Sequence, residues 1–374
     1  MTEGDDVGDR AAALHERALA LRAAGAFSEA AEAVGEAVAL FERAEGCASP
    51  NLANALIDHG DLLASLDRLD ESANAGERAI AILRPLIRTS AADADADVQA
   101  ELVRIAVRAH TTRAVTHRMR GDLAEAEAGC RSALALAEAR LPADDLLTAE
   151  ALNSLAVVHK FQGRYADAEA LYRRALAIVD RAGDDRDRAM LLHNLGGLAH
   201  ARGDHAAGEP LARQSVELRE RLLGADHPTT AADRAAWAAL LEGVGRLAEA
   251  ERAYADALAV FERRLGAHSL EVASTLTGLA GVQRARGAAG DAERAYRRAL
   301  AIREARLPAE HFDLGITLNN LAMVLLDRGA EDEAAPLLRR AHAVFTAALG
   351  PQHPHTGAVA STLDSLKPSS STAR

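Results

Sequence analysis

The feature that most constrains the fold is a turn residue that recurs eight times at nearly constant spacing. It is glycine in seven units and aspartate in one: Gly25, Asp67, Gly121, Gly163, Gly203, Gly245, Gly287 and Gly329. Successive turn residues are separated by 42, 54, 42, 40, 42, 42 and 42 positions. A period this regular predicts that each unit is one structural module packed against the next, as in repeat proteins.

Positions at fixed distances from the turn residue hold only small side chains. Seven residues before the turn stand only alanine and glycine, and five and twelve residues after it stand only alanine, serine and glycine. Larger apolar residues recur between them at spacings of three and four, which is the helical period. The small residues mark where two helices approach most closely. The sequence therefore predicts an all-α chain of helix–turn–helix units.

Short phrases within and between the units carry a family resemblance. They are Leu-Asn-Ser-Leu-Ala at 152–156, Leu-Asn-Asn-Leu-Ala at 318–322, Leu-Gly-Ala-Asp-His-Pro at 223–228 and Leu-Gly-Pro-Gln-His-Pro at 349–354. Together with the small residues and turn glycines, they resemble the tetratricopeptide repeat, whose usual period is 34 residues. The longer period of 42 is similar to the repeats of kinesin light chains. The resemblance implies a right-handed superhelical solenoid of about eight repeats plus a C-terminal capping helix.

The repeat pattern divides the chain into segments. We expect the solenoid to cover residues 9–366, with diverged repeats at 9–141, regular repeats at 145–350 and the capping helix at 355–366. The 54-residue interval contains an acidic stretch near 89–97, which we expect to be a loop and a candidate hinge. The flanking segments 1–8 and 367–374 are polar and are predicted to be disordered.

Composition excludes several classes of partner. The formal net charge of -12 opposes sequence-independent nucleic-acid binding, which requires a positive surface. Aromatic residues make up only 3% of the chain, too few for a base-stacking platform. The acidic N-terminus is unlike a signal peptide, and no apolar run is long enough to span a membrane. We therefore expect a cytoplasmic protein with neither a nucleic-acid nor a membrane partner.

No motif in the sequence indicates catalysis, a cofactor or a metal. The phosphate-binding, dinucleotide-binding, serine-hydrolase and zinc-protease motifs are all missing. Four histidines recur at the junctions between repeats, at His227, His268, His311 and His353. Adjacent repeats lie about 8–10 Å apart, so this row cannot converge on one metal ion; we expect its members to support the inter-repeat turns. We predict that the chain is not an enzyme, has no cofactor and holds no metal.

The resemblance implies that the first helix of each unit lines a concave groove, and asparagines recur on that helix. They stand nine or ten residues before the turn, at Asn153, Asn194, Asn319 and Asn320. Asparagine is unfavourable inside a helix because its amide competes for backbone groups, so each one requires a partner. The resemblance implies that they bind the backbone of an extended peptide. The alternative is that they bond across to the next repeat, and the sequence leaves both interpretations open.

A basic position lies three residues before the turn. Four units hold Arg22, Ala64, Glu242 and Leu326 there, and the other four hold Arg118, Lys160, His200 and Arg284. These side chains could form a positive track that favours an acidic peptide or a C-terminal carboxylate. They could equally interact favourably with the negative end of the helix dipole, at the C-terminus of each helix. Our hypothesis is that Arg118, Asn153, Lys160, Asn194 and His200 form the central peptide-contact region.

The leading functional prediction is a non-catalytic adaptor that binds a protein or peptide, with a preference for acidic ones, in its concave groove. The alternative is a regulatory subunit or signal-peptide sensor whose superhelix changes shape on ligand binding. A third possibility is self-assembly through the ends of the repeats, and the sequence leaves the oligomeric state open. No helix-turn-helix DNA-binding domain precedes the repeats, which argues against a peptide-regulated transcription factor.

Overall fold

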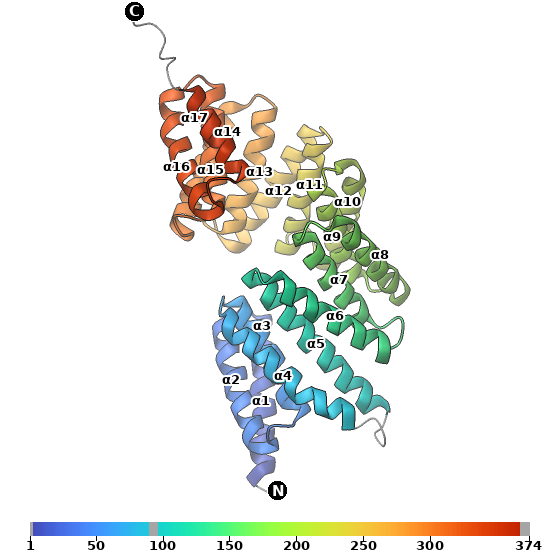
Figure 1. Ribbon diagram of the computed structural model, residues 1–374. Helices are drawn as coiled ribbons and strands as arrows, with labels where there is room; N and C mark the ends of the chain where they lie inside the picture. The colour runs from blue at the N-terminus through green and yellow to red at the C-terminus, as the bar shows by residue number, and fades with distance from the viewer. Residues whose placement is uncertain (1–2, 90–95, 367–374) are drawn as a thin grey trace, which may run out of the picture. The chain divides into compact units, whose positions relative to one another are not determined.

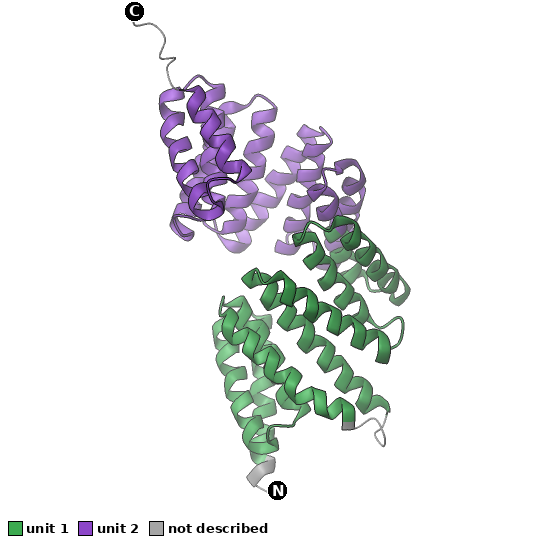
Figure 2. Cartoon of the chain, viewed as in Figure 1, with its two compact units in different colours: residues 1–194 green, residues 195–374 purple. Residues whose placement is uncertain are grey.

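The computed structural model describes residues 3–89 and 96–366, which form seventeen α-helices and contain no strand (Figure 1). For residues 3–5 and 89 only the backbone is described. The chain divides into two compact units, residues 1–194 (unit 1) and 195–374 (unit 2), and the division falls within one helix (Figure 2). The prediction of an all-α repeat solenoid is confirmed.

Unit 1 contains the helices of the first four repeats and most of α9. They are α1 (Glu3–Ala23), α2 (Phe27–Glu45), α3 (Pro50–Ser65), α4 (Leu69–Thr89), α5 (Ala96–Arg120), α6 (Leu123–Arg140), α7 (Leu146–Phe161), α8 (Tyr165–Ala182) and α9 (Asp185–Ala201). From α1 to α8, each helix packs against the next one in chain order. The first helices α3, α5 and α7 also contact each other in turn, so these three lie side by side.

Unit 2 repeats this arrangement. It contains α10 (His205–Leu223), α11 (Pro228–Gly243), α12 (Leu247–Leu265), α13 (Leu270–Ala285), α14 (Ala289–Arg306), α15 (Phe312–Asp327), α16 (Glu331–Leu349) and α17 (Pro354–Ser365). Each helix from α10 to α17 packs against the next. In both units the odd-numbered helix is the first helix of a repeat and the even-numbered helix is the second.

The segments expected outside the repeats are only partly described. Helix α1 begins at Glu3, so the described part of segment 1–8 is helical, where the sequence predicts disorder. An acidic residue such as Asp6 favours this helix, because it lies near the positive end of the helix dipole. Helix α4 ends at Thr89 and α5 begins at Ala96; residues 90–95 of the expected loop and the tail 367–374 lie outside the described residues. Helix α17 lies where the sequence predicts a capping helix.

The turn residues have the left-handed backbone conformation that explains the choice of glycine. In the seven glycine turns φ lies between 73 and 85°, and Asp67 has a φ of 60°. Asp67 is the one non-glycine residue with positive φ among those described. At the turn of Gly245, the glycine N–H donates to the carbonyl of Glu242, and the next N–H donates to the carbonyl of Leu241. These bonds satisfy the last carbonyls of the first helix and end it.

The small residues lie at the closest helix contacts, as the sequence predicts. In one repeat of unit 1, Ala156, Ala168 and Ala175 are all completely buried. The larger side chain of Tyr172 fills the space between them and is only 1% exposed. Because interiors are close-packed, a larger residue at the alanine positions would force the helices apart.

Three of the junction histidines cap the next first helix. The Nδ1 atom of His227 accepts the backbone N–H of Thr229 at 3.1 Å. His311 and His353 each accept the backbone N–H two residues further on in the same way, at 3.2 Å. At the fourth junction the cap is Ser269, which accepts from Val272, rather than its neighbour His268. The interpretation of these histidines as supports of the inter-repeat turn is confirmed for three of the four.

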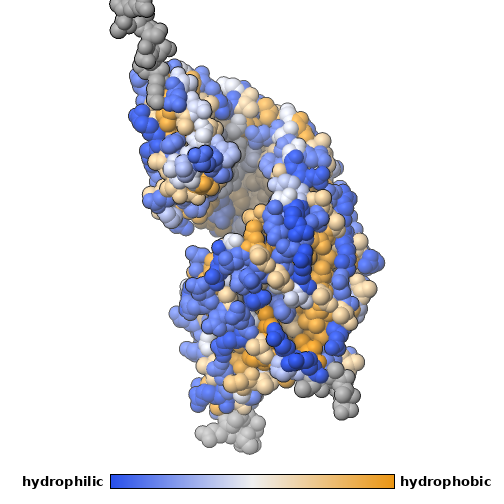
Figure 3. Space-filling view, in the orientation of Figure 1, coloured by the Kyte–Doolittle hydropathy of each residue, from blue (hydrophilic) through white to orange (hydrophobic). Residues whose placement is uncertain are grey.

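Hydrophilic side chains cover much of the face seen in the space-filling view, with apolar patches among them (Figure 3). Within residues 3–89 and 96–366, no helix combines the length and the apolar character that crossing a bilayer requires.

The turn conformation predicts a difference between two substitutions. Gly245→Ala should lower the free energy of unfolding by about 1–2 kcal/mol, because a Cβ atom is disfavoured at positive φ. Asp67→Gly should be neutral or slightly stabilising, because it relieves the one non-glycine turn. Urea denaturation followed by circular dichroism measures both. Equal destabilisation by the two variants would contradict this explanation of the turn.

Candidate functional site

The predicted contact residues are divided between the two units. Arg118, Asn153, Lys160 and Asn194 belong to unit 1, and His200, Arg284, Asn319 and Asn320 belong to unit 2. Each group is described within its own unit.

In unit 1, two of the predicted residues line one pocket of about 150 Å³ between α5, α6 and α7. Arg118 and Asn153 contribute polar groups, and Ser154 adds a hydroxyl. The fully buried Ala114 and the almost fully buried Cys130 contribute apolar surface. The pocket can therefore hold a small apolar group with polar or charged groups beside it.

Arg118 also stacks on an exposed aromatic ring. Its guanidinium carbon lies 5.4 Å from the centre of the Phe161 ring. Phe161 is 61% exposed, and Met119, next to Arg118, is 45% exposed. A cation over an aromatic face contributes about 0.5–1 kcal/mol at an exposed site. The contact holds Arg118 at the surface beside an apolar group, a combination that is common in protein interfaces.

Lys160, the residue before Phe161, is half-buried, and this burial lowers the pKa of its ammonium group. Among the described residues no carboxylate forms an ion pair with it. An anion approaching Lys160 would therefore not have to displace an internal partner. Its position three residues before the turn matches that of Arg118 in the preceding repeat.

Asn153 and Asn194 bond to each other across neighbouring first helices. The Nδ2 group of Asn194 donates to Oδ1 of Asn153 at 2.8 Å. This is the inter-repeat bond of the alternative interpretation. It leaves the Asn153 amide N–H groups and the Asn194 carbonyl oxygen without a partner among the described residues. The pair thus keeps amide N–H donors and one carbonyl acceptor, which match the C=O and N–H groups of an extended peptide.

The turn that follows Lys160 and Phe161, at the end of α7, is anchored by Glu127 of α6. This carboxylate accepts from Gln162 Nε2 at 2.8 Å and from Arg164 Nη1 at 2.9 Å. The bond from Gln162 is the largest cause that lowers the pKa of Glu127 to about 2, and Arg164 and His159 act in the same direction. The carboxylate is therefore ionised whenever the repeat is folded at ordinary pH.

The sequence analysis missed this anchor, although a signal for it was present. Glutamate stands six residues after the turn in five consecutive repeats, at Glu127, Glu169, Glu209, Glu251 and Glu293. In unit 2 the same position is used in the same way: Glu209 accepts from Arg246 at 3.1 Å and from Trp237 at 3.0 Å. Glu251 pairs with Arg286, and Glu293 pairs with Arg328.

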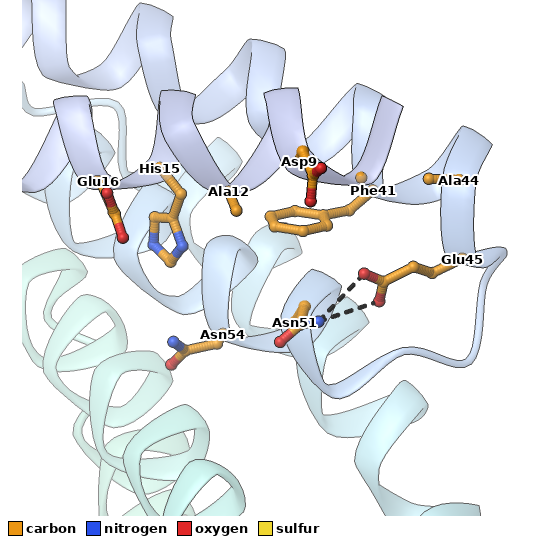
Figure 4. Close-up of a pocket in the computed structure, with 10 residues that line it drawn as sticks. Asp9, Ala12, His15, Glu16, Phe41, Ala44, Glu45, Asn51 and Asn54 are labelled. Carbon is orange, nitrogen blue, oxygen red and sulfur yellow. Dashed lines mark hydrogen bonds between the residues drawn. The ribbon is translucent and has the colours of Figure 1, made fainter. Parts of the chain in front are cut away.

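A second cavity of unit 1 has the opposite charge. It has a volume of about 660 Å³ and lies between α1, α2 and α3 (Figure 4). Asp9 and Glu16 of α1 point toward it, together with His15 and the ring of Phe41 (Figure 4). Glu45 of α2 accepts from Asn51 at 3.1 and 3.3 Å. This cavity would disfavour an acidic ligand, so the first-helix face of unit 1 is not uniformly basic.

A buried carboxylate ties the first three first helices together. Asp58 of α3 is 5% exposed and lies 2.8 Å from His15 Nε2 of α1. Its other oxygen accepts from Arg108 Nη2 of α5 at 3.0 Å, and Arg108 also donates to Asn54. Burial opposes the ionisation of Asp58, but the bond from His15 and the charge of Arg108 outweigh it and lower the pKa. The sequence analysis did not single out this cluster.

The predicted residues of unit 2 bond within the unit. Arg284 donates to both carboxylate oxygens of Asp327 of the next first helix, at 2.5 and 3.2 Å, which neutralises its charge. Asn319 donates to Asn320 at 3.4 Å. The ring of His200 lies 5.1 Å from that of His205. Within the described residues of unit 2, Arg284 is therefore ion-paired and does not contribute free positive charge to the predicted basic track.

The buried cysteine beside Arg118 is not a nucleophile at neutral pH. Burial raises the pKa of the Cys130 thiol to about 12, so the thiolate is essentially unpopulated. Within the described residues, no group of three histidine, cysteine or acidic side chains is arranged to hold a metal ion.

Comparison with protein families gives matches along most of the chain. One family profile described as tetratricopeptide repeat matches residues 9–84, 106–181 and 232–305, and a second with the same description matches 188–229 and 315–355. The chain belongs to the tetratricopeptide repeat family. Comparison with curated proteins finds no match.

Two solved structures, both of Rap proteins, share the fold over most of this chain. The apo form of RapI aligns with a TM-score of 0.57 at 13% identity, covering 79% of this chain and 97% of RapI. A Rap protein complexed with competence and sporulation factor aligns with a TM-score of 0.54 at 16% identity, covering 96% of this chain and 98% of that one. The kinesin light chain repeats of Podospora anserina, at 21% identity, cover 54% of this chain and 96% of theirs, with a TM-score of 0.46.

The low pKa of Glu127 predicts a pH-dependent contribution to stability. Its folded pKa of about 2 lies below the ordinary value of 4.5, so the contribution is complete above about pH 5 and is lost as the pH falls toward 2. Glu127→Gln should cost about 1.5–3 kcal/mol at pH 7 and flatten the dependence below pH 5. Urea denaturation at pH 7, 5 and 3 measures this.

The matched control is Glu125→Gln, which changes an exposed carboxylate of the same helix. It should lower the stability at pH 7 by no more than about 0.3–1 kcal/mol, the contribution of a carboxylate in the first turn of a helix, and should flatten the pH dependence far less than Glu127→Gln. A loss of the same size at pH 3 and pH 7 for Glu127→Gln would contradict the role of its ionised form.

Proposed function

We propose that this protein is a non-catalytic adaptor whose unit 1 binds an extended, acidic peptide segment on the face formed by its first helices. The observation that carries the proposal is the convergence of Arg118 and Asn153 on one pocket. In the next repeat stands Lys160, which forms no ion pair with any residue that the structure describes. Membership of the tetratricopeptide repeat family supports a protein-interaction scaffold in general. The peptide, its charge and its contacts are the proposed part.

The proposed contacts use three kinds of chemistry. The Asn153–Asn194 pair offers amide N–H donors and one carbonyl acceptor to the peptide backbone. Arg118 and Lys160 offer positive charge to an acidic side chain or a terminal carboxylate. The pocket of about 150 Å³ accepts one small apolar side chain. An extended peptide presents backbone C=O and N–H groups beside its side chains. A protein surface with a hydrogen-bonding pair next to a side-chain pocket therefore favours a peptide over a compact ligand.

The second candidate function is a regulatory subunit or signal-peptide sensor. The observation that favours it is the fold shared with the Rap protein that is complexed with competence and sporulation factor, which extends over 96% of this chain. In this case the peptide would occupy the site and its binding would also change the shape of the molecule.

Charge reversal tests the proposed site. The probe is an arrayed library of fluorescent extended peptides that vary in net charge, and the best acidic binder is then titrated by calorimetry. Arg118→Glu and Lys160→Glu should each weaken its binding at least tenfold and reduce its salt dependence, because both lose a charge-assisted contact. Asn153→Ala should weaken acidic and neutral peptides alike.

The control variant is Arg173→Glu, which makes the same charge change on the second helix α8, where Arg173 pairs with Glu169. It should leave the affinity unchanged. Equal losses in Arg173→Glu and Arg118→Glu would show only an effect of net charge. If no acidic peptide in the array binds, the proposed specificity is wrong.

Small-angle scattering distinguishes the two candidate functions. When the selected peptide is added at saturation, the radius of gyration of an adaptor should change only by the small amount that the added mass of the peptide causes. A sensor should change it clearly, and Arg118→Glu should abolish that change.

A further inference from the structure

A leucine position in the first helices has two polar exceptions. Eleven residues before the turn, six repeats carry a leucine: Leu14, Leu56, Leu152, Leu192, Leu276 and Leu318. The third repeat carries His110 there, and the sixth carries Arg234. Leu56 and Leu152 are 1% and 0% exposed, so this position belongs to the core. A cavity lies at each of the two exceptions.

The cavity at His110 has a volume of about 230 Å³ and lies between α4, α5 and α6 of unit 1. Its walls are mainly apolar, with Leu83, Ile87 and Ala106 buried. Ile80 of α4 and Leu136 of α6 complete the apolar surface. A pocket with these walls favours the apolar part of a ligand.

His110 contributes a polar atom without a partner. Its Nδ1 atom is buried and makes no hydrogen bond to any described residue. Burial, followed by the charges of Arg113 and Arg84, lowers the pKa of His110 to about 4, so the ring is neutral at pH 7. A buried polar atom without a bond costs free energy, and a ligand that supplies the bond would recover that cost.

Two arginines of α4 also line this cavity. Arg84 and Arg88 are exposed and lie one helical turn apart, on the side of α4 that faces the cavity. Among the described residues, neither forms an ion pair. A carboxylate suits this arrangement, because a guanidinium group binds it with two parallel hydrogen bonds.

The equivalent cavity at Arg234 is neutralised from within. Arg234 donates to Glu220 at 2.6 Å, and Asp226 in the same cavity accepts from Arg263 at 2.5 Å. Glu220 stands seventeen residues after its turn, which is the position of Arg84 in the second repeat. The cavity at Arg234 therefore supplies its own anion, whereas the described residues that line the cavity at His110 include two arginines and no acidic side chain.

We propose that the cavity at His110 binds a medium-chain monocarboxylate, with the apolar chain against Leu83, Ile87 and Leu136. Its carboxylate accepts from the N–H of the neutral His110 ring and from Arg84 and Arg88. A small molecule is favoured over a peptide because the cavity has a volume of only about 230 Å³ and its walls are mainly apolar. This site is separate from the peptide surface at Arg118 and Asn153, so each can be tested without the other.

The test is a calorimetric titration of the full chain with decanoate below its micelle concentration, with decanol as the uncharged analogue. Decanoate should bind saturably with one site per chain, and decanol at least tenfold more weakly. His110→Leu restores the residue that six other repeats carry, so it should fold and should abolish binding. The double variant Arg84→Gln, Arg88→Gln should weaken decanoate at least tenfold and leave decanol unchanged.

The matched control is Arg78→Gln on the same helix α4, where Arg78 pairs with Glu42 outside the cavity. It should bind decanoate as the native chain does. Circular dichroism melting confirms that every variant is folded. Non-saturable binding, equal affinity for decanol and decanoate, or full binding by His110→Leu would each overturn the proposal.

Discussion

The structure depends on the close approach of helices at three positions per repeat where only small side chains are allowed. Alanines such as Ala156, Ala168 and Ala175 are fully buried there, and the space around them is filled by one larger residue such as Tyr172. The left-handed turn residue brings the two helices of a repeat together at this distance. Because the same geometry recurs, any side chain at a given distance from the turn reaches an equivalent place in every repeat.

This equivalence explains how much of the fold could be predicted from the sequence. The period, the helix pairs, the turn glycines and the buried alanines follow from local rules that act within about forty residues. The N-terminal segment was harder: residues 3–8 are polar enough to suggest disorder, yet they continue α1. Polarity alone could not distinguish a solvated helical end from an unstructured one.

The candidate site was predictable only in part, because equivalent positions can have different partners. Arg118 and Arg284 occupy the same position, but Asp327 neutralises Arg284, whereas Arg118 rests on the ring of Phe161. Whether such an arginine is ion-paired depends on a residue of the next repeat. Comparing the same position across the repeats does not reveal that residue. The glutamates six residues after the turn and the buried Asp58 were overlooked for the same reason, since their partners on other helices stand 28 to 50 positions away in the chain.

The glutamate–arginine pairs described at Glu127, Glu209, Glu251 and Glu293 each join a repeat to its immediate successor only. No such pair skips a repeat among these four. In a linear assembly of nearest-neighbour contacts, a substitution that weakens one junction destabilises the adjacent repeats and has a smaller effect on repeats further away. Evolution can therefore retune the binding chemistry of one module while the remaining modules keep their architecture.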